Sequence, residues 1–187
     1  MTAATAPLTT EDLLALPDDG KRRWLIKGEL RENGMTIRNR FHSATMANIT
    51  GELYIWIRTL PEPRGQVVCG EAGVILPDDP TTTVGVDVAY VAPDVVIRQT
   101  DKTTLIDGVP TLIVEILSPS DTVEILDETI ATYRAVGVPL VWIVDPKDRT
   151  VTVYRHGEEP VLFNVKQELT GEDVLAGFRV AVGRFFE

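Results

Sequence analysis

One apolar segment with a single acid inside it sets the tightest constraint on this chain. Residues 111–117, TLIVEIL, read as a buried β-strand, and Glu115 lies within it. An ionised carboxylate in such surroundings loses its hydration, which is costly unless a partner is present. The segment therefore predicts a buried strand with a divalent cation, a cationic side chain or a proton at Glu115.

The other helices and strands are expected to follow one another along the chain without strict alternation. This order favours an α/β fold of the mixed α+β type, in which helices flank a mixed central β-sheet, over a doubly wound parallel fold. Periodicity and turn signals predict helices over residues 9–16, 41–60 and 122–133, and strands over residues 22–33, 65–76, 87–98, 111–117, 140–145, 150–155 and 161–167.

Length and composition fit one globular domain over residues 1–187, with residues 1–8 as a flexible arm. The chain has 187 residues, of which 44% are hydrophobic and 25% charged. One cysteine allows no intrachain disulfide, which fits the reducing cytoplasm. No signal peptide is expected, and no segment approaches the roughly 18 apolar residues of a membrane span, so no membrane partner is expected.

The net charge of −10 argues against a broad basic surface for nonspecific binding of nucleic acid. It still allows a local basic groove, or a metal site that contacts phosphate.

A second acid, Asp94, lies in the predicted strand 87–98. A polar connector joins this strand to the strand of Glu115, so the two strands are expected to pair and to bring both carboxylates together. Hard cations such as Mg²⁺ take oxygen ligands of this kind, and a lysine commonly completes phosphate chemistry. On the alternative interpretation, each acid is only salt-bridged or lies at a strand edge.

Several features occur together in this chain: APDVVI, PTLIVEILSPSD, a tyrosine before AVGVPLVWIVDP, RTVTVYR, LIKGEL and a histidine that heads the long helix. Together they resemble the Uma2-type putative restriction endonucleases of the PD-(D/E)XK nuclease superfamily. The resemblance covers residues 20–163. It implies a restriction-endonuclease-like core and Mg²⁺- or Mn²⁺-dependent hydrolysis of DNA phosphodiester bonds.

The resemblance also implies roles for single residues. Asp94 and Glu115 match the two metal-binding acids, Glu29 matches an acid at the edge of the site, and His42 matches a histidine near it. On the alternative interpretation, Glu29 is a charge at a strand end and His42 is a residue at a helix start.

The family's lysine is missing from this chain. The resemblance places it four residues before Tyr133, where this chain has Thr129, and the residue two after Glu115 is Leu117. Helical geometry puts Thr129 beside Tyr133, on the flank of an apolar stripe. A lysine there could reach Glu115, whereas threonine is too short and uncharged. The stripe consists of Val123, Leu126, Ile130 and Tyr133.

Three functional hypotheses stay open. The chain is a metal-dependent DNA endonuclease weakened at Thr129, with Lys27, Arg98 or Lys102 as a substitute cation. Alternatively, it is a catalytically degenerate module that binds DNA or protein. On the third hypothesis, both acids are satisfied by internal hydrogen bonds and the function lies elsewhere. A homodimer, in which a late strand supplies an edge, is compatible with each.

Overall fold

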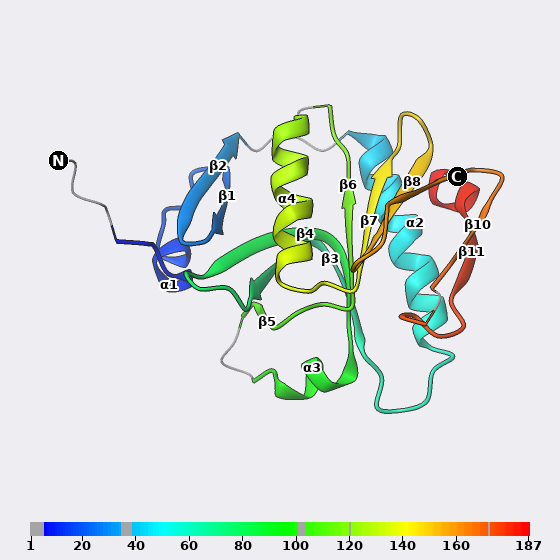
Figure 1. Ribbon diagram of the computed structural model, residues 1–187, viewed down its shortest axis with the longest axis horizontal. Helices are drawn as coiled ribbons and strands as arrows, with labels where there is room; N and C mark the ends of the chain where they lie inside the picture. Colours follow the sequence, from blue (N-terminus) through cyan, green and yellow to red (C-terminus); the bar gives the residue numbers. More distant parts are fainter. Residues whose placement is uncertain (1–5, 35–38, 101–103, 120, 172) are drawn as a thin grey trace.

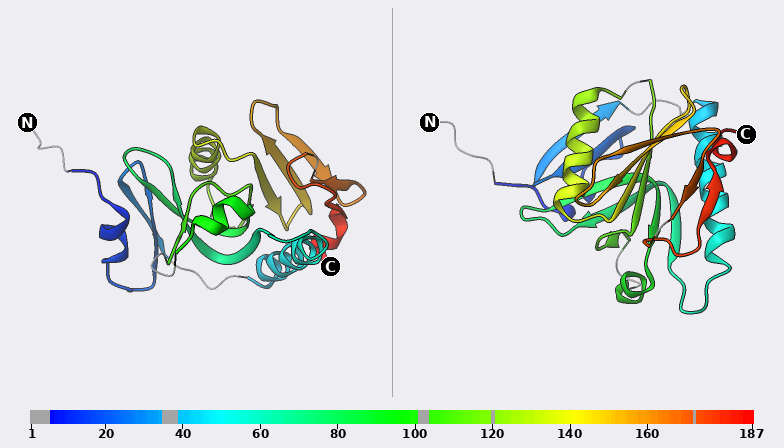
Figure 2. Two further views of the ribbon diagram at one scale, coloured as in Figure 1. Left: turned by 90° about the horizontal axis from the view of Figure 1, so that it is seen from below. Right: turned by 45° about the vertical axis from the view of Figure 1, so that its right-hand side comes forward.

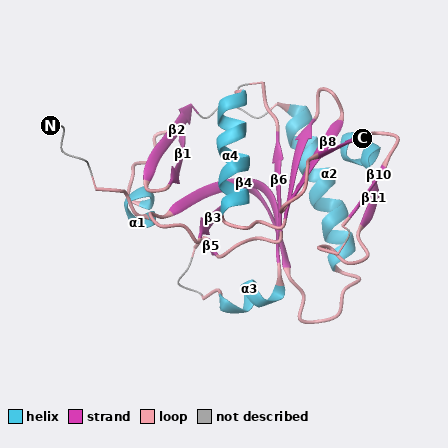
Figure 3. Cartoon of the chain, viewed as in Figure 1, coloured by secondary structure: helices cyan, strands magenta, loops and turns pink. Residues whose placement is uncertain are grey.

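A mixed β-sheet with helices on both faces forms the centre of the protein. The computed structural model describes residues 6–34, 39–100, 104–119, 121–171 and 173–187. Figures 1 and 3 show α4 (Val123–Ala135) in front of the sheet and α2 (Arg40–Ile57) beside it. Figure 2 shows that these two helices cover opposite faces of the sheet. This arrangement buries both sides of the central strands.

Within the described residues, nine strands form the main sheet. Seven follow the spatial order β2-β1-β4-β6-β7-β8-β9, while β3 pairs with β4 and β5. The β6–β7 and β3–β5 pairs are parallel, and the other pairs are antiparallel. The strands are β1 (Lys21–Ile26), β2 (Glu29–Gly34), β3 (Gln66–Leu76), β4 (Thr82–Val91), β5 (Ile106–Asp107), β6 (Leu112–Ile116), β7 (Leu140–Asp145), β8 (Thr150–Arg155) and β9 (Val161–Asn164).

Three of the described α-helices begin where a side chain satisfies the first backbone N–H groups, while the third along the chain begins with a proline. Thr9 caps the first helix, Asn39 the second, and Thr122 the fourth. The helices are α1 (Thr10–Leu14), α2 (Arg40–Ile57), α3 (Pro93–Arg98) and α4 (Val123–Ala135). At the end of the chain, β10 (Glu168–Thr170), β11 (Arg179–Ala181) and the 3₁₀ helix η1 (Val182–Phe186) pack beside α2.

Two apolar clusters, one on each face of the sheet, form the core. Ile49 and Leu53 of α2 pack with Trp142 of β7 in the first cluster. Ile130 and Tyr133 of α4 pack with Ile113 of β6 in the second. Because β6 contributes to both clusters, it is buried on both faces, as its apolar sequence indicates.

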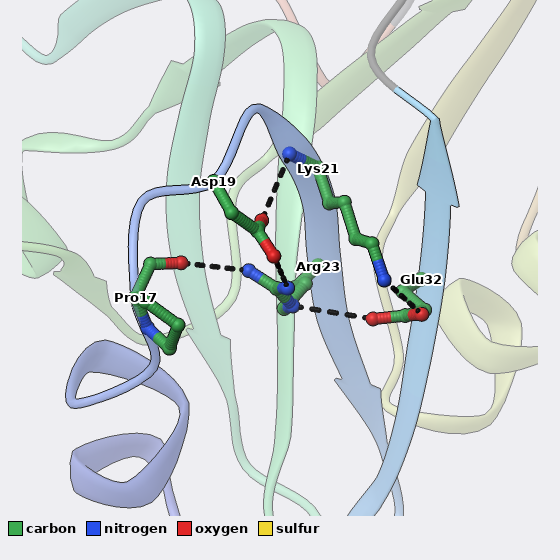
Figure 4. A network of polar contacts seen from close by, with 5 residues as sticks. All are labelled: Pro17, Asp19, Lys21, Arg23 and Glu32. Carbon is green, nitrogen blue, oxygen red and sulfur yellow. Dashed lines mark hydrogen bonds and ion pairs between the residues drawn. The ribbon is translucent and has the colours of Figure 1, made fainter.

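A network of charges fixes the β1–β2 hairpin against the segment after α1 (Figure 4). The Arg23 guanidinium donates to the Pro17 carbonyl at 2.8 Å and to the Asp19 and Glu32 carboxylates at 2.6 and 3.3 Å. Lys21 also pairs with Glu32, at 2.7 Å. Lys21 and Arg23 thus lie on one face of β1, which places Arg22, the residue between them, on the other face.

Two features of the predicted elements are wrong. The predicted strand 87–98 is interrupted, because β4 ends at Val91 and α3 begins at Pro93. Proline lacks an N–H and has a fixed φ, so it suits the first turn of a helix better than a central strand. Val123, expected in the apolar stripe of α4, is 70% exposed in the first turn of the helix.

The expected arm over residues 1–8 lies partly outside the described residues. Of its described part, Leu8 donates a backbone hydrogen bond of 2.8 Å to Gly28 in the β1–β2 turn. Among the helices described, none combines the length and apolar character that a membrane crossing requires.

Two residues of α2 test the assignment of its buried face. Leu53 is 0% exposed and Ile55 is 63% exposed. Leu53→Ala is expected to lower the free energy of unfolding by about 2–5 kcal/mol, because it removes packed atoms and leaves a cavity. Ile55→Ala is expected to change it by less than about 0.5 kcal/mol. Urea unfolding followed by circular dichroism measures both, and equal effects would contradict the assignment.

Candidate active site

Asp87 fills the place where β4 and β6 stop pairing. The two strands pair from Tyr90–Leu112 to Val88–Val114, and the next position in this register would set Asp87 opposite Glu115. There the Asp87 carboxylate accepts the Ile116 N–H at 2.8 Å, so a side chain replaces the backbone ladder. Asp87 is only 3% exposed, and its carboxylate is therefore fixed between the two strands.

His42, in the first turn of α2, supports Asp87 from the other side. Its Nε2 lies 3.2 Å from the same carboxylate oxygen that accepts the Ile116 N–H. The histidine is 1% exposed. Asp87 therefore connects α2, β4 and β6, and its carboxylate has little freedom to turn.

Glu115 lies beside Asp87 and is held by α4. The Tyr133 hydroxyl, from a side chain that is 1% exposed, donates to the Glu115 carboxylate at 2.5 Å. Burial, and then the negative charge of Asp87, raise the pKa of Glu115 to about 8, against the lowering effects of Arg22 and Tyr133. Burial and the Glu115 carboxylate also raise the pKa of Tyr133, which keeps its hydroxyl a donor.

A cavity of about 70 Å³ opens between α4 and the β1–β4–β6 part of the sheet. It is wide enough for a few water molecules or a hydrated ion. The residues around it that bear on chemistry are Arg22, Asp87, Glu115, Asp121, Thr129 and Tyr133.

Arg22 carries the only positive charge among the described residues that line this cavity. It lies between Lys21 and Arg23 on β1, on the opposite face of the strand. Its Nη2 donates to the Gly85 carbonyl at 2.9 Å and lies 2.9 Å from the Glu71 carboxylate. The guanidinium also lies 5.6 Å from the centre of the Trp24 ring.

The structure brings only some of the expected residues to the cavity. Glu115 and Thr129 line it, and His42 contacts Asp87. The placement expected for Asp94 is wrong: its side chain is 70% exposed on α3, where it pairs with Arg98 at 3.6 Å. Figure 1 shows α3 beyond the end of the sheet from which β6 starts.

Glu29 does not line the cavity either. It is 71% exposed at the start of β2 and pairs with Arg31 at 3.0 Å. Neither Lys27 nor Arg98, considered as substitute cations, lines the cavity, and Lys102 lies outside the described residues. Arg31 also forms an ion pair with Glu128 at 2.8 Å, which joins the β1–β2 hairpin to α4.

Three residues at the cavity were missed by sequence analysis as parts of the site, and they differ in the signal they give. Asp87 stands inside the apolar run VGVDVAYV, the same pattern that singled out Glu115. Tyr133 served to locate position 129 and was placed in the apolar stripe of the helix, but its hydroxyl was not considered as a donor to Glu115. Nothing in the local sequence distinguishes Arg22 from its neighbours Lys21 and Arg23.

The fold described above agrees with a match to a solved structure. The chain superposes on a crystal structure of a putative nuclease belonging to DUF820 from Anabaena variabilis ATCC 29413 with a TM-score of 0.78. The match has 18% sequence identity and covers 96% of this chain and 98% of the other. The fold is therefore of the restriction-endonuclease-like class, as the sequence resemblance implied.

The family follows from the sequence. The model of the Uma2 family, described as "Putative restriction endonuclease", matches residues 10–183, and the chain belongs to this family. The structural match and the family description together support a nuclease-like function. No curated protein matches the chain.

The donor set suits a hard divalent cation. Two carboxylates lie side by side, and burial together with the charge of Asp87 raises the pKa of Glu115, so a cation would favour its ionised form. No group of three or more His, Cys, Asp or Glu residues in the described chain could hold a metal ion. Mg²⁺ is commonly bound by one or two carboxylates, with water and substrate oxygens completing its shell.

The pKa of Glu115 predicts a pH-dependent stability in metal-free protein. Its pKa lies at about 8 in the folded protein against an ordinary value of 4.5, so the folded state binds more protons between these values. The stability that protonated Glu115 contributes is complete below about pH 4.5 and is lost as the pH rises through about 8. Glu115→Gln keeps an acceptor for Tyr133 and removes the titration.

We therefore expect Glu115→Gln to be more stable than the native protein at pH 8.5, by at least about 1 kcal/mol in EDTA. At pH 5 the two proteins should be nearly equal. Urea unfolding at both pH values measures the difference. A difference that does not change with pH would contradict the raised pKa.

Proposed function

We propose that this protein is a divalent-metal-dependent DNA endonuclease whose cation, Mg²⁺ or Mn²⁺, is held by Asp87 and Glu115. The observation that carries the proposal is the pair of carboxylates in one cavity, with Asp87 fixed by the Ile116 N–H and Glu115 by the Tyr133 hydroxyl. Such an arrangement is costly without a cation. The family and the nuclease with the same fold support DNA as the substrate.

The proposed reaction is hydrolysis of a phosphodiester bond. The oxygen of a water molecule forms a bond to phosphorus, and the bond from phosphorus to one ester oxygen breaks. The water gives up a proton, the leaving oxygen gains one, and the products are a phosphomonoester and a free hydroxyl. A bound divalent cation would acidify the water and offset negative charge on the phosphate.

The chain's own groups position this chemistry. Asp87 cannot rotate freely, because Ile116 and His42 hold the same oxygen. Tyr133 holds one oxygen of Glu115, and Glu115 lines the cavity. Fixed ligands of this kind reduce the reorganisation that accompanies the reaction.

Exchanging the candidate aspartates separates this proposal from the placement that the sequence suggested. Asp87→Asn is expected to abolish Mn²⁺ binding measured by calorimetry, and to lower cleavage of plasmid DNA by at least about 10²-fold, because it removes a ligand charge. Asp94→Asn, on exposed α3, is the matched control and should leave both unchanged. Loss of Mn²⁺ binding in Asp94→Asn alone would contradict the proposal.

A second candidate function is a catalytically degenerate module that binds DNA or protein. It is favoured by Thr129, which faces the cavity at the position where the family resemblance places a lysine. If catalysis has been lost with the lysine, Thr129→Lys should restore the missing charge and create cleavage that the native protein lacks.

This variant separates the two functions directly. On the nuclease proposal, the native protein cleaves plasmid DNA in Mn²⁺, and Thr129→Lys changes the rate without creating the activity. Cleavage by Thr129→Lys alone, with Mn²⁺ bound by both proteins, would establish the degenerate module. The expected cytoplasmic location and homodimer stay predictions.

A further inference from the structure

The guanidinium of Arg22 is only partly used by the protein. Both contacts to the Gly85 carbonyl and the Glu71 carboxylate are made by Nη2. The Nε and Nη1 groups form no hydrogen bond with any other described residue. Because arginine has five N–H donors in a planar fork, one edge of Arg22 still offers donors to a ligand.

The surroundings of Arg22 are built to hold it there. Glu71 lies in a β-bulge of β3 between Cys69 and Ala72, and its φ of 61° is unusual for a residue with a side chain. Gly85 leaves room for the pair, since a Cβ atom there would lie 3.1 Å from the Glu71 carboxylate. A bulge, a strained residue and a glycine thus converge on one arginine.

The charge of Arg22 acts on the proposed reaction centre. Arg22 lines the same cavity as Asp87, Glu115 and Thr129, and so does Gly85, whose carbonyl accepts from the guanidinium. In hydrolysis of a phosphodiester, a cation in this place would offset charge on the non-bridging oxygens.

We propose that Arg22 takes the place of the lysine that position 129 lacks, and that its Nε–Nη1 edge binds the non-bridging oxygens of the scissile phosphodiester. The proposal rests on the nuclease function proposed above. Glu71 and Gly85 hold one nitrogen of the guanidinium and thereby aim the remaining donors. Arginine suits this role because its fork matches two phosphate oxygens at once.

Arg22→Gln is the main test, because glutamine keeps a donor for the Gly85 carbonyl and removes the charge. Cleavage of plasmid DNA in Mn²⁺ is expected to fall by about 10²–10³-fold in kcat/KM. Arg22→Lys should fall less, since it keeps the charge and loses the fork. Arg23→Gln is the matched control, because Arg23 is ion-paired on the opposite face of β1 (Figure 4) and should leave cleavage unchanged.

Two readouts separate this role from a purely structural one. Calorimetry should show that Mn²⁺ binds Arg22→Gln at least as tightly as the native protein, because a neighbouring positive charge is gone. In Ca²⁺, the salt dependence of binding to a short DNA duplex should fall by about one unit of log–log slope. A distorted site would instead lose Mn²⁺ affinity together with cleavage.

A double variant that moves the positive charge from position 22 to position 129 completes the experiment. The double variant Arg22→Gln/Thr129→Lys should recover part of the lost cleavage, because a lysine at 129 enters the same cavity. Native-like cleavage by Arg22→Gln would overturn the role of Arg22 while leaving the nuclease function intact. Absence of Mn²⁺ binding and of cleavage in the native protein would overturn both.

Discussion

The hydrogen bond from the Ile116 N–H to the Asp87 carboxylate is the contact on which the candidate site depends. It forms at the position where the β4–β6 ladder ends, and it sets a carboxylate beside Glu115. His42 lies against the same oxygen, so the first turn of α2 is part of the arrangement. A site of this kind requires the sheet, α2 and α4 to be in place together.

The charges around the cavity explain why a bound cation would stabilise the site. Among the described residues, three acids (Asp87, Glu115 and Asp121) and one arginine line the cavity, and that arginine also contacts Glu71. A shift of one pKa unit corresponds to about 1.4 kcal/mol, so the raised pKa of Glu115 represents a substantial cost of ionisation. A divalent cation would remove that cost, and a phosphate oxygen could then approach a centre that otherwise repels it.

Much of the fold could be predicted from the sequence, because it is governed by local signals. Thr9 marked the start of α1 and the apolar spacing predicted α2, while the run around Glu115 predicted β6. The placement of Asp94 in a strand was wrong for a local reason as well, since Pro93 starts a helix rather than continuing a strand. The pairing of β4 with β6 was expected correctly, but the register selects Asp87. Arg22 reaches the cavity through long-range pairing, which periodicity does not encode.

A crystal structure of the native protein soaked in Mn²⁺, with anomalous diffraction recorded at the manganese edge, tests the central claim most directly. The account predicts one anomalous peak in the cavity within ligand distance of both Asp87 and Glu115, and no peak at Asp94. A cavity without a peak, or a peak held by Asp94 on α3, would contradict it.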